Sequence, residues 1–208
     1  MQISAKEFMS GLDKMVENPV CELNFGSNFE LLVAVILSAQ CTDKRVNMVT
    51  SKLFKKYNTP EDFVNLPVEK IEEMIKPCGF YHNKARAIKA TSSDIIERFG
   101  GEVPSTFQEL VTLRGVGRKT ANVMISVAFK GDAFAVDTHV LRVSNRLGFA
   151  KTQNPDLCER RLKEVFPQDR WSKLHYQMVL FGRYTCKAIK PECQNCLFKS
   201  KCKNARCV

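Results

Sequence analysis

The sequence predicts an all-α fold. Apolar residues recur at helical spacing along most of the 208 residues, and capping residues and glycines mark the ends of these segments. No series of alternating apolar and polar residues indicates a sheet. The pattern yields about ten helices without an internal repeat or a low-complexity linker. This number of helices is compatible with two lobes that share a cleft.

The first half of the chain contains well-delimited helical segments. Ser27 and Glu30 form a capping-box pattern, and the residues after it are apolar nearly all round, as in a helix buried within a bundle. Thr59 and Pro60 mark another helix start. The helices expected here cover 29–37, a segment starting at 60, 68–75 and 84–99.

The second half contains a short glycine turn between two helices. Ser105 and Gln108 form a second capping-box pattern, and Gly115 and Gly117 separate this helix from the next one. Helix, glycine turn and helix over about 105–129 have the local layout of a helix-hairpin-helix unit. The helices expected in this half start at 105 and cover 118–129, 138–147, 155–166 and 171–183.

The charge of the chain indicates a polyanionic partner. The net charge is +10, although many basic proteins bind no nucleic acid. The longest apolar run, 31–37, is far shorter than the ~20 residues of a membrane span, so we expect no membrane association. The N-terminus lacks a basic-then-apolar signal pattern, and we therefore expect a cytoplasmic, nucleoid-associated protein.

The glycine turn is a candidate phosphate site. Its helix start presents unpaired backbone N–H groups and the positive end of the helix dipole, which attract a phosphate without reading base sequence. An ordinary helix–helix turn is the alternative interpretation. The residues expected to contact DNA here are Arg114, Gly115, Val116, Gly117 and Arg118.

Lys119 and Asp137 are the candidate catalytic residues. Lys119 is expected in the first turn of the helix after the hairpin, where the dipole disfavours an ammonium and favours a free amine that can attack. Asp137 is expected to cap the next helix and to present a carboxylate to an incoming cation. A solvated lysine and a plain helix cap are the alternatives, and spacing alone does not bring the two together.

Four of the nine cysteines form a candidate metal site. In a reducing compartment, four cysteines within a short segment indicate thiolate ligation rather than disulfides. Zinc sites usually pair two Cys-x-x-Cys knuckles, and only one is present, so the spacing favours a [4Fe–4S] cluster over zinc. The predicted ligands are Cys186, Cys193, Cys196 and Cys202. We expect Cys207 to be a spare cysteine, and Cys21, Cys41, Cys78 and Cys158 to pack as small hydrophobic residues.

Three further residues are candidate DNA contacts. Lys190 is one of several basic residues around the cysteines, which together suggest a second phosphate-facing patch. Gln40 ends the apolar helix over 29–37, although a polar helix terminus is the simpler interpretation. Phe80 lies in a turn with Tyr81; most such aromatics belong to a core, but a wedge into a base stack is the alternative.

Taken together, these motifs resemble the endonuclease III family of helix-hairpin-helix DNA glycosylases. The resemblance covers essentially the whole chain. Each motif alone is weakly specific, whereas the combination is highly specific. It is carried by the segments 31–43, 79–85, 115–123, 135–140 and 182–186 and by the four-cysteine tail.

The resemblance implies a fold, an activity and a role for each residue. It implies two helical lobes flanking a DNA-binding cleft: a six-helix barrel over 22–132, and an iron–sulfur cluster lobe over 1–21 and 133–208 with the cluster loop at 186–202. It implies a bifunctional glycosylase and AP lyase, expected as a monomer, that removes oxidised pyrimidines from duplex DNA containing damaged bases or abasic sites. Lys119 would be the Schiff-base nucleophile and Asp137 the catalytic carboxylate, with Gln40 filling the gap left by the extruded nucleotide and Phe80 wedging the opposite strand.

The sequence departs from the family pattern at two positions. Arg114 stands where the family usually has proline, which predicts a less rigid turn with an added charge beside the phosphates. Phe80 stands where leucine is expected for the wedge. Neither departure affects the proposed catalytic pair.

Two other functions remain as alternatives. An adenine-DNA glycosylase shares the cluster and the hairpin, but that family lacks the lysine and has a glutamate in its first buried helix, whereas 31–40 contains no acid here. It also carries an additional C-terminal domain, and this chain has only a short tail after Cys202. A non-catalytic DNA-binding iron–sulfur protein that senses redox state would have no need of Lys119 with Asp137.

Overall fold

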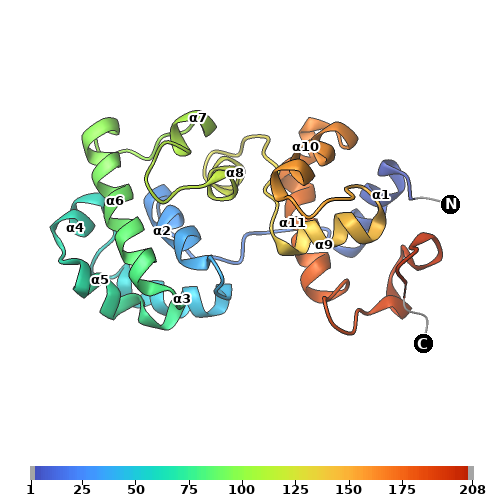
Figure 1. Cartoon of the computed structure of the whole chain (residues 1–208), viewed down its shortest axis with the longest axis horizontal. Coiled ribbons are helices and arrows are strands. Elements are labelled where there is room, and N and C mark those ends of the chain that lie inside the picture. The colour runs from blue at the N-terminus through green and yellow to red at the C-terminus, as the bar shows by residue number, and fades with distance from the viewer. Residues whose placement is uncertain (1–2, 206–208) are drawn as a thin grey trace. The chain divides into compact units, whose positions relative to one another are not determined.

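Helices are the regular secondary structure of the protein over residues 3–205. The computed structural model describes residues 3–205, in which there are eleven α-helices, four short 3₁₀ turns and no strand (Figure 1). The prediction of an all-α fold is thus confirmed. Within the same range, no helix has both the length and the apolar character needed to cross a membrane.

The chain divides into two compact units. One is the contiguous segment Glu22–Lys130, named here the insert unit. The other joins the N-terminal segment up to Cys21 to the segment from Gly131 onward, and is named the terminal unit. Each unit is described by itself.

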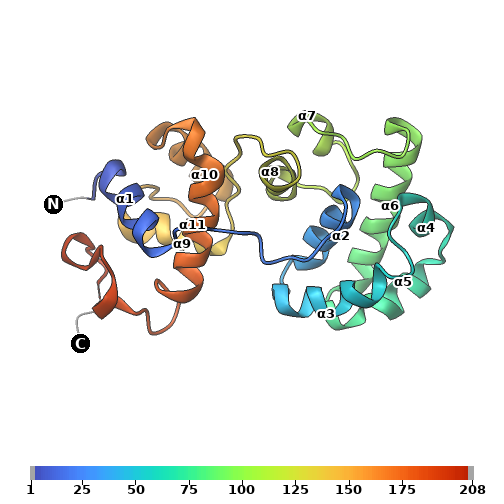
Figure 2. The same cartoon turned by 180° about the vertical axis from the view of Figure 1, so that it is seen from behind.

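The insert unit is organised around a buried helix and a long one. Helix α2 is buried from Leu31 to Leu37, as its apolar sequence predicts, and it packs against α3, α6 and α8. Figure 2 shows α4 and α5 beside the long helix α6, against which both pack. The helices of this unit are α2 Asn28–Ser38, α3 Asp43–Leu53, α4 Pro60–Asn65, α5 Val68–Ile75, α6 Tyr81–Phe99, α7 Phe107–Leu110 and α8 Arg118–Val127, with a 3₁₀ turn η1 at Lys76–Cys78.

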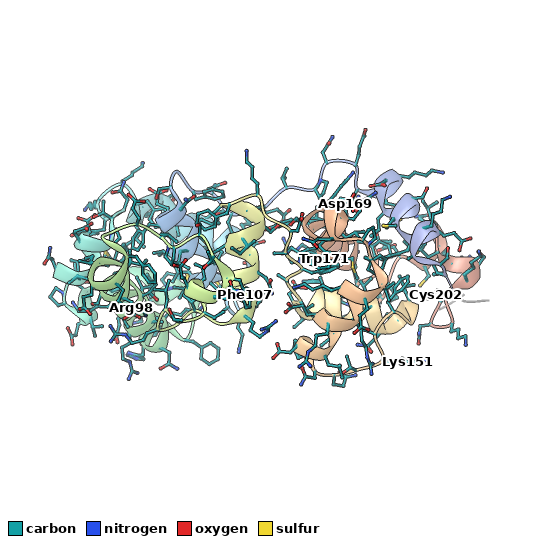
Figure 3. The ribbon with its side chains drawn as sticks, turned by 90° about the horizontal axis from the view of Figure 1, so that it is seen from above. Arg98, Phe107, Lys151, Asp169, Trp171 and Cys202 are labelled. Carbon is teal, nitrogen blue, oxygen red and sulfur yellow. The ribbon has the colours of Figure 1, made fainter. Side chains whose placement is uncertain are left out.

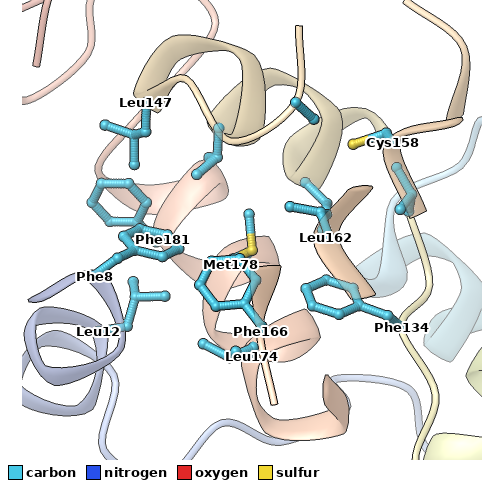
Figure 4. Packing of buried hydrophobic residues seen from close by; sticks show 14 of the residues in the cluster. Phe8, Leu12, Phe134, Leu147, Cys158, Leu162, Phe166, Leu174, Met178 and Phe181 are labelled. Atoms are coloured by element: carbon cyan, nitrogen blue, oxygen red, sulfur yellow. The ribbon is translucent and has the colours of Figure 1, made fainter. Parts of the chain in front are cut away.

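The terminal unit has a core rich in phenylalanine. Helix α11 packs against α9 and α1, which places Phe8 of α1 against Phe149, Phe166 and Phe198, with ring centroids 4.9 to 5.9 Å apart. Figure 4 shows this packing around Met178 and Phe181. The helices of this unit are α1 Ala5–Met15, α9 Thr138–Leu147, α10 Pro155–Val165 and α11 Trp171–Tyr184.

Two helix starts differ from the prediction. Helix α6 begins at Tyr81 rather than at 84, because Phe80 takes a left-handed conformation that serves as its N-cap. Helix α7 is capped by Thr106, which bonds Glu109 in both directions, so the expected pair of Ser105 and Gln108 is wrong by one residue.

Two helices were not singled out from the sequence, and two cysteines are less buried than expected. Helix α1 has a complete capping box between Ser4 and Glu7, and α3 is capped by Thr42. Cys78 and Cys158 are buried as predicted, whereas Cys21 and Cys41 are only partly buried. Cys207 lies outside the described residues.

Candidate functional site

The glycine turn between α7 and α8 needs glycine at its first position. Gly115 has φ +91°, and a Cβ there would lie 2.7 Å from the Cβ of Ala87 in α6. Both the left-handed backbone and the close approach to a neighbouring helix therefore exclude a side chain. The turn is anchored by buried Leu113 and Val116, whose backbones are hydrogen bonded to each other.

One face of α6 holds the turn in place. Ala87, Thr91, Asp94 and Arg98 follow one another at intervals of three or four residues and so share a side of the helix. The Thr91 hydroxyl donates to the carbonyl of Arg114. The Arg98 guanidinium donates to the carbonyl and the hydroxyl of Thr112 at 3.2 and 2.7 Å.

Arg114 is fastened to this face by Asp94. The backbone N–H and the guanidinium of Arg114 donate to the Asp94 carboxylate at 2.7 to 2.9 Å. Burial disfavours the carboxylate, but the hydrogen bonds from Arg114 outweigh it and hold the pKa of Asp94 below its ordinary value. The predicted loss of rigidity is therefore offset where proline is absent, because the guanidinium binds one Asp94 oxygen and the backbone N–H of Arg114 binds the other. The Arg114 side chain remains 60% exposed.

The start of α8 presents its backbone N–H groups without a side-chain cap. Gly117 occupies the N-cap position in an extended conformation, and nothing lies within 4 Å of where its Cβ would be. The guanidinium of Arg118 lies over the ring of Phe107, 5.0 Å from its centroid (Phe107 is labelled in Figure 3). Lys119 is the second residue of α8 and is exposed. The two glycines of the turn are thus followed directly by two basic residues, Arg118 and Lys119, in the first turn of α8.

Gln40 and Phe80 are exposed residues with left-handed backbones. Gln40 has φ 52° and Phe80 has φ 47°, a conformation that costs a non-glycine residue about 1–3 kcal/mol. Phe80 is 63% exposed. The two segments are tied together by Lys84, whose buried ammonium donates to the carbonyls of Leu37 and Cys78 at 2.8 and 2.9 Å.

Asp137 belongs to the terminal unit and caps α9, as predicted. It accepts a hydrogen bond from the backbone N–H of Val140 through one carboxylate oxygen at 2.8 Å. The residue is partly buried. Lys119, the other candidate catalytic residue, belongs to the insert unit.

The four predicted cysteine ligands line one pocket in the terminal unit. Among the described residues, no three His, Cys, Asp or Glu side chains gather closely enough to hold a single metal ion. Four cysteine thiols are the donor set that an iron–sulfur cluster requires. Arg146 also lines the pocket and donates to the thiol of Cys186 at 3.4 Å.

The cysteine loop is fastened to the helices by one aromatic and one arginine. Phe198 is buried, packs against Phe8 and Phe181, and lies so near Gly11 that a Cβ there would be 2.4 Å from its ring. Arg146 of α9 donates to the carbonyls of Lys187 and Ala188 at 2.6 and 3.0 Å. Lys190 is exposed at the tip of this loop, with φ 50°.

The sequence reasoning missed the supporting residues of these sites. Asp94, Arg98 and Lys84 look like the polar face of an ordinary surface helix, yet Lys84 is 5% and Asp94 is 5% exposed. Their helical spacing relative to Ala87 was the available signal. The partner that each one binds lies far away in sequence, and no local pattern reveals it.

Comparison with known proteins agrees with this geometry. Residues 33–168 match the HhH-GPD superfamily of base excision DNA repair proteins. Endonuclease III of Bacillus subtilis (strain 168) is 48% identical over 98% of this chain and 95% of its own length. A solved structure of a trapped endonuclease III–DNA covalent intermediate is 45% identical over 98% of both chains, with a TM-score of 0.94. A non-covalent endonuclease III–DNA complex is 46% identical over 96% of this chain and 94% of its own, with a TM-score of 0.93. The chain belongs to the endonuclease III family of the HhH-GPD superfamily.

Proposed function

We propose that this protein is a bifunctional DNA N-glycosylase and AP lyase that removes oxidised pyrimidines from duplex DNA. The observation that carries the proposal is Lys119, an exposed amine in the first turn of a helix whose N-terminal amides lack a side-chain cap. An endonuclease III caught in a covalent intermediate with DNA, at 45% identity to this chain, supports covalent chemistry.

Binding begins at the glycine turn. A backbone phosphate accepts hydrogen bonds from the amides at the start of α8, which have no side-chain cap, beside the charge of Arg118. The damaged nucleotide leaves the base stack at a cost of a few kcal/mol, which is smaller where the lesion already weakens stacking. Gln40 fills the gap and Phe80 wedges the opposite strand; their exposure and their fixed left-handed backbones suit insertion.

Lys119 then acts as the nucleophile. Its neutral amine attacks C1′ of the sugar, the glycosidic bond breaks, and the base departs with the bonding electrons and a proton. The sugar ring then opens as the C1′–O4′ bond breaks and O4′ takes up a proton, which leaves a protonated Schiff base at C1′. This Schiff base acidifies the C2′ proton. Loss of that proton expels the 3′ phosphate by β-elimination, which cleaves the strand on the 3′ side of the abasic site.

Asp137 supplies the carboxylate for this chemistry. With one oxygen engaged by the Val140 N–H, the carboxylate is fixed in orientation by its own helix. It stabilises the cationic sugar and assists proton transfer.

Cys186, Cys193, Cys196 and Cys202 would hold a [4Fe–4S] cluster, as their shared pocket supports. When bound, the cluster ties the loop into a fixed shape. The basic side chains of this loop, Lys190 among them, then form a second phosphate-facing patch. Three expectations stay predictions. They are the location in the cytoplasm with the nucleoid, the monomeric state, and the division into a barrel lobe and a cluster lobe around a cleft.

Borohydride trapping tests the nucleophile. We expect the protein to form a covalent adduct with duplex DNA that carries an oxidised pyrimidine or an abasic site, and Lys119→Gln to reduce the adduct to background. Lys52→Gln removes the same charge from an exposed lysine of α3 and should leave trapping intact. An adduct that persists in Lys119→Gln would overturn the assignment.

The same experiment separates the alternatives. Adenine release without trapping would indicate an adenine-DNA glycosylase. Binding to DNA without an adduct or strand cleavage, in protein with its cluster loaded, would indicate a redox sensor.

A further inference from the structure

Two cysteines that the proposed chemistry does not use meet within the insert unit. Cys41 follows the end of α2, and Cys78 ends the 3₁₀ turn η1, against which α3 packs. The side chain of Cys41 neighbours that of Cys78, since it is one of the groups that raise the pKa of Cys78. Cys78 is 2% exposed, whereas Cys41 is partly exposed. Cys41 is therefore the more exposed residue of the pair.

Lys84 fixes the two chain segments at this point. Its buried ammonium donates both to the carbonyl of Leu37, at the end of α2, and to the carbonyl of Cys78 itself. The two thiols are thus held near each other by a structural contact between their backbones. Gln40 and Phe80, the two exposed residues with left-handed backbones, lie one and two residues from these thiols in the sequence.

We propose that Cys41 and Cys78 form an oxidation site, which closes to a disulfide with hydrogen peroxide or a similar mild oxidant and so shifts Gln40 and Phe80 out of their DNA-binding positions. Disulfides in a reducing compartment are usually transient and serve redox sensing, which suits a thiol pair that is reduced in the resting protein.

The reaction balances with one peroxide. The exposed Cys41 sulfur attacks a peroxide oxygen, which gives a sulfenic acid and one water. The Cys78 sulfur then attacks the Cys41 sulfur and displaces hydroxide, which leaves as a second water with the Cys78 proton. Two thiols are oxidised to one disulfide, and one peroxide is reduced to two waters.

The surroundings support this order of events. Burial, together with the neighbouring Cys41, raises the pKa of Cys78 to about 11, so Cys78 reacts second and needs a proton acceptor. The departing hydroxide is that acceptor, because Lys84 is already an ammonium bound to the carbonyls of Leu37 and Cys78.

The effect on DNA rests on the proposed function of Gln40 and Phe80. A new covalent bond draws the two segments together next to both residues. Since a displacement of about 1 Å can cost an enzyme ~10²-fold in rate, we expect at least about a tenfold loss of borohydride trapping after oxidation.

Peptide mapping tests the thiol pair directly. The protein with its cluster loaded is treated with hydrogen peroxide while its visible absorbance is followed, and the digested product is analysed by mass spectrometry. We expect a Cys41–Cys78 linkage that dithiothreitol reverses and that disappears in Cys41→Ser and in Cys78→Ser. Cys158→Ser, which removes a buried cysteine of the terminal unit, should keep the linkage. Oxidation of Cys41 without this linkage would overturn the proposal.

Trapping assays on the same samples test the consequence. Re-reduction should restore trapping in the wild type, and Cys78→Ser should lose no trapping at the peroxide level that closes the wild-type pair. If the linkage forms and trapping is unchanged, the proposed displacement is wrong. If the reduced protein traps nothing, the proposed function fails, while the mapped linkage still decides the thiol pair.

Discussion

Asp137 accepts the Val140 N–H at the start of α9 and is also the carboxylate proposed for catalysis. These roles can be separated because asparagine caps helices as well as aspartate does, whereas alanine does not. We expect Asp137→Asn to change the stability by less than about 0.5 kcal/mol and Asp137→Ala to lower it by about 1 kcal/mol. Both variants should lose ~10²–10⁴-fold in the rate of base release.

Thermal unfolding and single-turnover base release measure these two effects. A stable and fully active Asp137→Asn would leave Asp137 as a helix cap and nothing more.

Substitutions at Gly115 and Gly117 can be compared directly, because only Gly115 has a backbone conformation that requires glycine. Gly115→Ala places a methyl group at φ +91° and 2.7 Å from Ala87, which should destabilise the protein by about 1–3 kcal/mol. Gly117→Ala meets open space at φ −92°, and its effect should stay within about 0.5 kcal/mol. Urea unfolding compares the two. Equal losses would contradict the account of the turn.

At the scale of single elements, α6 acts as the support of the hairpin. The ion pair from Asp94 to Arg114 fastens the turn, so a double-mutant cycle with Asp94→Asn and Arg114→Ala should give a coupling energy of about 1.5–3 kcal/mol. Lys52→Gln on α3 provides a distant control that should not couple. A coupling energy near zero would mean that the ion pair between Asp94 and Arg114 does not stabilise the turn.

The pH dependence of the Asp94 contribution has a definite sign. The pKa of Asp94 lies below its ordinary value in the folded protein, so the carboxylate stabilises the fold above the unfolded pKa of ~3.9. This contribution is lost as the pH falls from that value through the folded pKa. The stability difference between wild type and Asp94→Asn should therefore be constant from about pH 5 to 8 and shrink below about pH 4. A difference that grows on acidification would contradict this assignment.

Helices and their caps were the most predictable part of the molecule. α5 and α9 begin and end where the sequence places them. The Asp137 cap of α9 is a local signal that acts on its own neighbours. The contacts of Asp94 and Lys84 could not be predicted in this way. Each depends on which distant backbone group the fold brings to the same helix face.

At the scale of the whole molecule, the cysteine loop and the single tryptophan belong to the same unit. Trp171 begins α11, donates its indole N–H to the carbonyl of Phe166 at 2.8 Å, and lies under the ammonium of Lys163. Its fluorescence therefore reports on the terminal unit. We expect Cys196→Ala to lose the visible absorbance of the cluster and to lower the denaturant midpoint followed by Trp171.

The circular dichroism of the helices provides the comparison, since it also includes the insert unit. A colourless wild type that contains zinc would contradict the cluster, and an unchanged tryptophan transition would contradict its role in stability.

The family was predictable from the whole sequence because its motifs are spread over the entire chain. The pairing of the partly exposed Cys41 with Cys78 could not be predicted in the same way. A lone cysteine beside an apolar helix looks like a core residue until its neighbour is known. Local patterns therefore predict elements and chemistry-bearing motifs, whereas pairs formed across the fold emerge only in three dimensions.

The division of the chain also has a consequence for synthesis on the ribosome. Helix α1 is made first, but its apolar residues Phe8 and Leu12 belong to a core that, outside the N-terminal segment, is built from residues 134 onward. The insert unit is contiguous and can complete its own core as soon as Lys130 has emerged. We therefore expect the middle of the protein to fold before its beginning, while α1 waits for the arrival of α11.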